Sequence, residues 1–129
     1  MLNSENISLK KVLIVDDNDD LRTIFARAFD RRHFSVLVAV DGITAIESLH
    51  AELPDVLILD VNMPRLSGFD VLRYVRENQA TKDVKVVLVT GNCMAMQDPA
   101  AEDADLLLIK PVGIMDLVTL AQRLIQADA

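Results

Sequence analysis

The sequence predicts an α/β fold in which a parallel β-sheet is covered by helices on both faces, and three observations support this prediction. Five short apolar runs, at 10–16, 34–40, 55–60, 84–90 and 105–110, alternate with longer stretches of helical period. The runs are apolar at consecutive positions, as in strands that are buried on both faces. The chain has 129 residues without a linker-like stretch, which suits a single domain.

The first half of the chain predicts two strand–helix units. The run 10–16 ends on acidic residues, and an amphipathic helix with Asn18 and Asp19 as candidate caps follows it. The apolar positions of this helix repeat with a period near 3.6: Leu21, Ile24, Phe25, Ala28 and Phe29. After the second strand, 34–40, Asp41-Gly42 marks a turn. The next helix is expected to place four residues on one face: Ala45, Ile46, Leu49 and Leu53.

The second half predicts three further strands. Pro54 and Asp55 open the third strand, whose apolar residues lead directly into Asp60. A third helix is indicated by Leu66, Phe69, Leu72 and Val75, and the last and clearest helix by Ile114, Leu117, Val118, Ala121, Leu124 and Ile125. Between the fourth and fifth strands, residues 91–104 contain Pro99 and only scattered apolar positions, which predicts a short or irregular helix.

Five strands of this kind fit a doubly wound sheet of flavodoxin-like order 2-1-3-4-5, because right-handed crossovers leave few other topologies. The first strand is not followed by a Gly-x-Gly-x-x-Gly motif, so a dinucleotide-binding fold has no support.

The apolar runs, cysteine content and net charge argue against several classes of protein. No apolar run approaches the length of a membrane span, and the first residues lack the apolar stretch of a signal peptide. The single cysteine, Cys93, cannot form an internal disulfide, and a free thiol suits a cytoplasmic protein. The net charge of −7 argues against direct binding of nucleic acid. We expect an N-terminal extension over 1–9 and one domain over 10–127.

Polar residues stand where the strands end. The first strand ends in Asp16 and Asp17, the third in Asp60, the fourth in Thr90 and the fifth in Lys110. Strand ends of a parallel sheet lie along one edge, and in the order 2-1-3-4-5 the switch point falls between the first and third strands. The three carboxylates should therefore meet there. Like charges at close range disfavour full ionisation, and a hard cation such as Mg²⁺ would relieve the repulsion. Such a site suits phosphoryl transfer.

The chain resembles the receiver domain of two-component response regulators from about Lys10 to about Ala127. The motifs that carry the resemblance are Asp16-Asp17, "LILDVNMPRLSG", "LVTG" and "LIKP", each at a strand end and in the order of the family. The resemblance implies a signalling switch rather than an enzyme in the usual sense. The partners that it implies are a sensor histidine kinase or histidine phosphotransfer protein and a downstream protein.

The resemblance also implies a role for each site residue. Asp60 would be the phosphoacceptor. Asp17 and Asp60 would bind Mg²⁺ (or Mn²⁺) directly, Asp16 would bind it through a water, and the backbone carbonyl of Asn62 would be the third protein ligand. The resemblance further implies that Thr90 and Lys110 contact phosphoryl oxygens, that Pro64 and Gly68 shape the loop after Asp60, and that the Lys110–Pro111 peptide is cis.

Three features depart from the family pattern. Leu107, expected to be buried, stands where the family usually carries the aromatic residue that couples to the threonine, so the switch should be modified. The shortened segment between Thr90 and Lys110 should alter the surface that partners usually read. Gly91 replaces a more common alanine and could alter the lifetime of an acyl phosphate.

Two other functions remain open on the sequence. Leu107 and the shortened segment are compatible with an interaction module that works without phosphorylation. An aspartyl phosphohydrolase usually has a second acid two residues after its nucleophile, where this chain has Asn62. We assign no role to His33, expected in a loop, or to His50, expected on an exposed helix position. Cys93 is expected to be structural, and Met94 and Met96 to pack in the core or at its rim.

Overall fold

The computed structural model describes residues 9–126 and contains a five-stranded parallel sheet of order β2-β1-β3-β4-β5. The strands are β1 (Lys11–Val15), β2 (Ser35–Ala39), β3 (Val56–Asp60), β4 (Lys85–Thr90) and β5 (Leu106–Ile109). The four α-helices are α1 (Asp19–Arg31), α2 (Gly42–Ala51), α3 (Gly68–Glu77) and α4 (Ile114–Gln126). The predicted fold class and strand order are confirmed.

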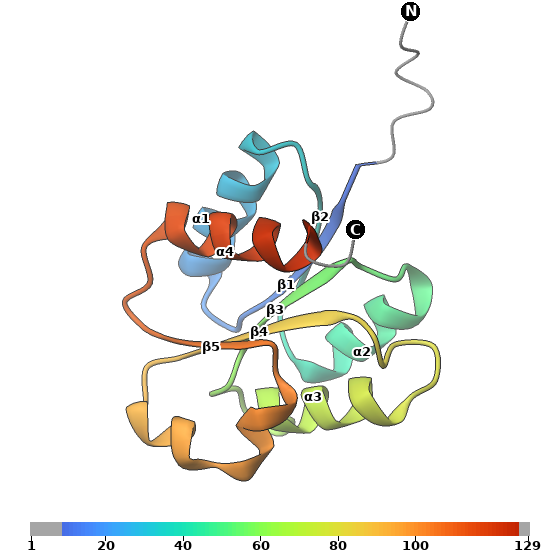
Figure 1. The fold of residues 1–129 in the computed structure, drawn as a ribbon, viewed down its shortest axis with the longest axis vertical. Helices are drawn as coiled ribbons and strands as arrows, with labels where there is room; N and C mark the ends of the chain where they lie inside the picture. Colours follow the sequence, from blue (N-terminus) through green and yellow to red (C-terminus); the bar gives the residue numbers. More distant parts are fainter. Residues whose placement is uncertain (1–8, 127–129) are drawn as a thin grey trace, which may run out of the picture.

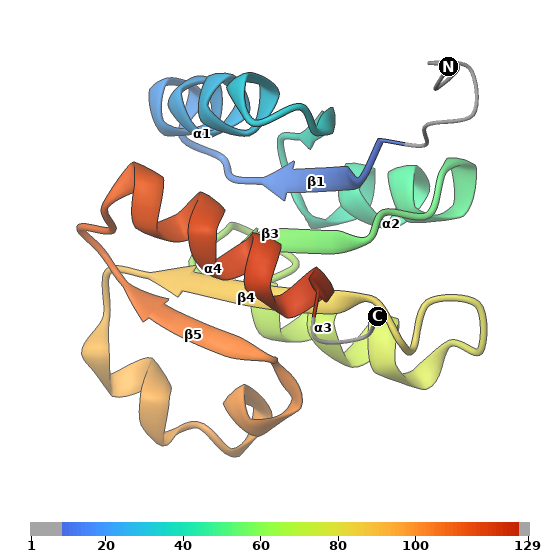
Figure 2. The same ribbon diagram turned by 45° about the horizontal axis from the view of Figure 1, so that its top comes forward.

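The helices lie on both faces of the sheet, with α1 and α4 together on one face and α2 and α3 on the other (Figures 1 and 2). Alternate residues of each central strand point to opposite faces of the sheet. Leu13, Val15, Leu57 and Leu59 belong to the core under α2 and α3, whereas Val12, Ile14, Val56 and Ile58 belong to the core under α1 and α4. The central strands are therefore buried on both sides, which explains why their sequences are apolar at consecutive positions.

The first three helices begin at polar capping residues close to the strand ends. Asn18 accepts a hydrogen bond from the backbone N–H of Leu21, as expected of a cap of α1. Asp41 and Ser67 form capping boxes at the starts of α2 and α3. Two helix limits differ from the predicted patterns. Helix α2 ends at Ala51 and leaves Leu53 half exposed, and α3 begins at Gly68, after Leu66.

The sequence predicts a short or irregular helix over 91–104, and the described residues between β4 and β5 form no α-helix. Two 3₁₀ segments replace it, η2 (Cys93–Gln97) and η3 (Pro99–Asp103). Asp98 separates them and accepts a hydrogen bond from the N–H of Ala100. Met94 and Met96 are 59% and 61% exposed, so their expected packing in or beside the core is wrong. Pro99 and the scattered apolar positions leave no continuous apolar face for an α-helix to bury.

The predicted N-terminal extension, 1–9, lies outside the described residues except for Leu9, as does residue 127 at the other limit of the predicted domain. Among the helices formed by residues 9–126, none has the length and apolar character that crossing a membrane requires.

Candidate phosphoryl-transfer site

Three carboxylates meet at the carboxyl ends of β1 and β3. Asp16 and Asp17 follow β1 directly, and Asp60 is the last residue of β3. The two strands are neighbours in the sheet, with Val15 opposite Leu59, so the acids that follow them lie side by side. One carboxylate oxygen from each acid lies within 4.8 Å of the others. Asp16 and Asp60 are buried, whereas Asp17 is exposed to solvent.

Lys110 provides the positive charge beside these acids. Its Nζ lies 3.5 Å from Oδ2 of Asp16 and 3.6 Å from Oδ1 of Asp60. Its backbone N–H donates to the carbonyl of Thr90 at 2.7 Å, which joins the end of β5 to the end of β4. The Lys110–Pro111 peptide bond is cis. The lysine is therefore held between the two buried carboxylates.

Asp60 has the clearest electrostatic perturbation in the site. Burial raises its pKa, and the nearby charge of Asp16 raises it further. The ammonium of Lys110 and the N–H of Asn62 lower it only in part. The net result is a pKa of about 6, compared with 3.8 for an ordinary aspartate. The fold thus leaves the charge of Asp60 only partly compensated.

Thr90 is fully buried and accepts two hydrogen bonds at its hydroxyl oxygen. The side-chain amide of Asn62 donates to Oγ1 at 3.2 Å, and the backbone N–H of Asn92 donates at 3.1 Å. Because a hydroxyl has two lone pairs and one hydrogen, these contacts leave the O–H as a donor for another group. The backbone N–H of Asn62 also donates to Oδ1 of Asp60 at 3.2 Å. Asn62 therefore links the acid to the hydroxyl.

Gly68 allows α3 to start against the end of β3. A Cβ at this position would lie 2.4 Å from the backbone oxygen of Asp60 and 2.8 Å from the Cα of Val61. The N–H of Gly68 donates to the carbonyl of Val61 at 2.9 Å. Pro64 lies exposed in the intervening loop. Glycine is needed here because another backbone approaches too closely for a side chain.

The other residues singled out in the sequence lie away from the three acids or differ from expectation. Leu107 is half-buried rather than buried and packs against the core under α2 and α3. Gly91 has open space where a side chain would be. Cys93 is a free, exposed cysteine. His33 is exposed in a turn, and the exposed His50 on α2 contacts Tyr74 on α3.

Sequence reasoning missed two residues that shape the site. Arg22 donates from Nη1 to the backbone carbonyl of Asp16 at 2.7 Å, and Asn92 supplies its N–H to Thr90. Arg22 lies among the polar positions of an amphipathic helix, where arginine normally faces solvent. Asn92 acts through its backbone, which any residue except proline could provide. Neither role leaves a distinctive signal in a single sequence.

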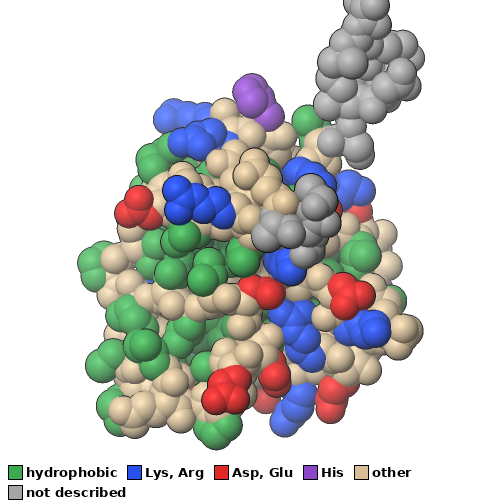
Figure 3. Space-filling view, in the orientation of Figure 1, with side chains coloured by type: hydrophobic (Ala, Val, Ile, Leu, Met, Phe, Trp, Pro, Cys, Tyr) green, Lys and Arg blue, Asp and Glu red, His purple; other side chains and the backbone are tan. Residues whose placement is uncertain are grey.

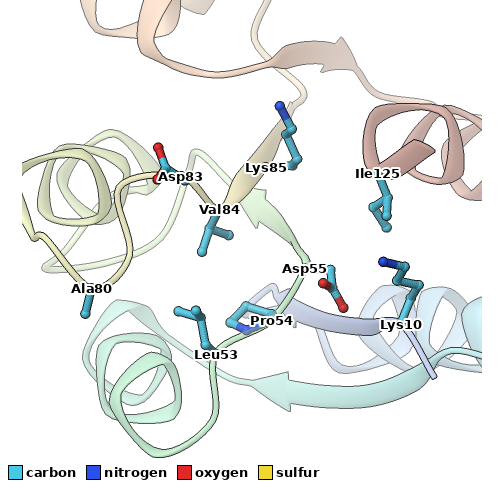
Figure 4. Close-up of a pocket in the computed structure, with 9 residues that line it drawn as sticks. All are labelled: Lys10, Leu53, Pro54, Asp55, Ala80, Asp83, Val84, Lys85 and Ile125. Atoms are coloured by element: carbon cyan, nitrogen blue, oxygen red, sulfur yellow. The ribbon is translucent and has the colours of Figure 1, made fainter. Parts of the chain in front are cut away.

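A separate pocket lies at the amino ends of the strands, at the other end of the sheet from the three acids (Figure 4). Its volume is about 310 Å³, and it is lined by Lys10, Leu53, Pro54, Asp55, Ala80, Asp83, Val84, Lys85 and Ile125. Asp55 in this pocket already accepts a hydrogen bond from the backbone N–H of Lys11 at 2.8 Å. None of the strand-end acids lines it, so it is distinct from the candidate site.

The donor set at the three acids suits a hard divalent cation. Carboxylate oxygens are the ligands that Mg²⁺ prefers, and a dication would offset the repulsion that raises the pKa of Asp60. A nucleophilic carboxylate beside a fixed lysine and a free hydroxyl donor is also suited to receive a phosphoryl group.

Comparisons with known proteins agree with this geometry. The family model described as "Response regulator receiver domain" matches residues 12–122. Response regulator MprA of Mycobacterium avium (strain 104) is 31% identical over 118 residues, which cover 90% of this chain and 51% of that protein. The probable transcriptional regulator ycf27 of Guillardia theta is 38% identical over 82 residues, which cover 64% of this chain and 31% of that protein. The chain thus spans about half the length of MprA.

Solved structures of similar proteins share the fold over nearly their whole length. Chemotaxis response regulator CheY4 of Vibrio cholerae has a TM-score of 0.83 and 28% identity, over 90% of this chain and 98% of that one. Response regulator TrrA of Thermotoga maritima, solved in complex with Mg(2+)-BeF, has a TM-score of 0.83 and 26% identity, over 90% and 99% of the two chains.

Proposed function

Because the chain belongs to the response regulator receiver domain family, we propose that it is a phosphorylation switch in which Asp60 accepts a phosphoryl group from phosphohistidine. The observation that carries the proposal is the position of Asp60, with Lys110 at 3.6 Å and oxygens of two further acids within 4.8 Å. The donor is a sensor histidine kinase or a histidine phosphotransfer protein, and the switch works in the cytoplasm by changing its affinity for a downstream protein.

In the proposed transfer, an oxygen of Asp60 attacks the phosphorus atom as the P–N bond breaks. The electron pair of that bond goes to the imidazole nitrogen, and an acyl phosphate forms on Asp60. The rigid end of β3 aims the carboxylate. The ammonium of Lys110 neutralises one phosphoryl oxygen, and the free O–H of Thr90 donates to another.

A divalent cation fits the carboxylates of Asp16, Asp17 and Asp60. When bound, Mg²⁺ (or Mn²⁺) would neutralise charge on the carboxylates and on the phosphoryl oxygens. By the family pattern, Asp17, Asp60 and the Asn62 carbonyl would hold it directly and Asp16 through a water. The similar fold of TrrA, which was solved with Mg(2+)-BeF bound, supports this assignment.

A protein donor has a suitable surface to approach on the face of the molecule formed by α1 and α4. An apolar hollow of about 540 Å³ lies between α1 and the start of α4, a few residues after Lys110. Ile24, Ile114 and Met115 expose apolar side chains there, and Arg27, Arg31 and Arg32 surround them. We assign this hollow to the phosphodonor, whose contact surface would be apolar with acidic groups around it.

The two alternative functions receive less support. A module that works without phosphorylation would not need a lysine held between two buried acids. A phosphohydrolase would need a general acid at position 62, where the amide of Asn62 instead donates to Thr90.

The experiment that tests the proposal is intact-protein mass spectrometry after incubation with acetyl phosphate. The wild type should gain the mass of one phosphoryl group with Mg²⁺ present and not in EDTA, and Asp60→Asn should gain none. An unmodified wild type that also releases no inorganic phosphate would favour the phosphorylation-independent module. Steady release of phosphate without a stable adduct would favour a hydrolase.

A further inference from the structure

A loop of only three residues, 16–18, delivers two of the three site acids. It joins the end of β1 at Val15 to the start of α1 at Asp19. Oδ1 of Asp16 accepts the N–H of Asn18 at 2.9 Å, and the side chain of Asn18 accepts the N–H of Leu21 at 2.9 Å. Asp17 lies between these two turns, and no donor on residues 9–126 holds its carboxylate. The direction of Asp17 therefore depends on the backbone of the loop.

Arg22 closes this loop from the first turn of α1. Its Nη1 donates to the backbone carbonyl of Asp16 at 2.7 Å, and its Nη2 pairs with Oδ1 of Asp19 at 2.5 Å. The two acceptors stand at the two ends of the loop, on either side of Asp17. The Arg22 side chain is only 14% exposed, whereas that of Asp19 is 85% exposed. The guanidinium is thus packed against the loop, and its place is not explained by a surface ion pair.

The geometry requires an arginine. A planar guanidinium offers several donors in a fixed fork and can bind two acceptors at once, whereas the ammonium of lysine is a compact charge on a flexible stem. Charge does not explain the residue, because a positive charge beside three carboxylates opposes the binding of a dication. The guanidinium therefore contributes to the site by positioning the β1–α1 loop.

We propose that Arg22 is a positioning residue for the divalent-cation site and fixes the β1–α1 loop so that Asp17 presents its carboxylate beside Asp16 and Asp60. The proposal rests on the proposed function in that a cation binds these acids. Residues that orient metal ligands without touching the metal typically account for about 10- to 100-fold in affinity. Here we expect a loss of about tenfold when the fork is removed.

The test measures the affinity of the protein for Mn²⁺ by electron paramagnetic resonance of the free ion, with Mg²⁺ as competitor. Arg22→Lys keeps the charge and loses the fork, and Arg22→Gln loses both. Arg73→Lys is the matched control, because Arg73 also pairs with an aspartate three residues before it, at 3.4 Å, but on the exposed surface of α3. Circular dichroism at the assay temperature confirms that each variant is folded.

Both Arg22 variants should bind Mn²⁺ about tenfold more weakly than wild type, and Arg73→Lys should bind it equally well. The slower phosphorylation of Arg22→Lys by acetyl phosphate should recover at saturating Mg²⁺, which a general loss of structure would not allow. Unchanged affinity in Arg22→Lys, or tighter binding in Arg22→Gln, would mean that Arg22 acts through charge alone and would overturn the proposal. A wild type that binds no Mn²⁺ would overturn the proposed function, and the role of Arg22 with it.

Discussion

Asp60 lowers the stability of the fold at neutral pH, because its charge is buried beside that of Asp16. Its pKa is raised from 3.8 to about 6, so the folded state favours the protonated form. The favourable contribution of that form is complete below pH 4 and is lost as the pH rises through 6. A shift of this size corresponds to about 3 kcal/mol at most. Asp60 thus lowers stability at neutral pH, and the binding of a cation can offset this effect.

Asp60→Asn should therefore be more stable than wild type at neutral pH without metal. We expect its free energy of unfolding to exceed that of wild type by about 2–3 kcal/mol above pH 7 in EDTA, and the difference to vanish toward pH 4. Urea unfolding between pH 4 and 8 measures this, with the exposed Asp30→Asn as control. A difference that does not change with pH would show that burial of the charge is not its cause.

Asn62 and Thr90 should act as one unit. Asn62 donates to the hydroxyl oxygen. In the proposed transfer, this contact would direct the O–H of Thr90 toward the phosphoryl group. Asn62→Ala should slow phosphorylation by acetyl phosphate about tenfold in the wild-type background. In a Thr90→Val background, where there is no hydroxyl to orient, the same change should have almost no further effect. Independent, multiplying effects in this double-mutant cycle would show that Asn62 acts by another route.

At the scale of secondary structure, Arg76 ties the 3₁₀ segments to the rest of the fold. Its guanidinium donates from α3 to the carbonyls of Asp103 at 2.8 Å, Lys82 at 2.9 Å and Val84 at 2.7 Å, and to Oδ2 of Asp105 at 3.0 Å. The same oxygen of Asp105 accepts the N–H of Val86 at 2.7 Å. One side chain thus joins α3, the turn before β4, η3 and the residue before β5.

Arg76→Ala should loosen this region more than an ordinary surface mutation. Losing the four hydrogen bonds should lower the free energy of unfolding by about 2–4 kcal/mol and speed hydrogen exchange in η3 and β5. Arg73→Ala, on the same helix with one exposed ion pair, should cost less than about 1 kcal/mol. Equal losses for the two variants, with exchange unchanged in η3, would contradict this role for Arg76.

The strands and the acids at their ends could be predicted from the sequence because the physics that places them is local and periodic. Apolar runs such as Val56–Leu59 identify buried strands, and parallel strands bring their ends to one edge. The irregular segment after Thr90 was also predictable, because Pro99 and scattered apolar residues exclude a long helix. The contacts of Arg22 and Arg76 were not, because arginine on a helix surface has the same pattern whether or not a carbonyl lies within reach. The exposure of Met94 and Met96 depends on how η2 packs, which composition does not determine.

At the scale of the whole molecule, the face drawn in Figure 3 separates apolar from charged side chains. Apolar side chains gather on the left half of the face in Figure 3, around α4, β5 and the 3₁₀ segments, and charged side chains dominate the right half. The exposed methionines of η2 and the half-buried Leu107 lie in this part of the fold. The surface around β5 and the 3₁₀ segments should therefore differ from that of a receiver domain with a full helix after β4.

Cation binding should stabilise the whole domain. A ligand that binds only the folded state, present at ten times its dissociation constant, adds about 1.4 kcal/mol. Mg²⁺ at that concentration should give this increase in wild type and much less in Asp17→Asn, whereas Asp20→Asn, three residues further along the chain, should behave as wild type. Calorimetry with and without Mg²⁺ measures the effect. Equal stabilisation of Asp17→Asn would place the cation elsewhere.

The assignment of Asp60 as the phosphoacceptor is tested by locating the phosphoryl group chemically. Borohydride reduces an aspartyl phosphate to homoserine, and peptide mass mapping then identifies the converted residue. After incubation with acetyl phosphate and Mg²⁺, we expect homoserine at position 60 and at no other aspartate. Homoserine at another aspartate, or at none in protein that has gained a phosphoryl group, would contradict the assignment of Asp60 as the acceptor.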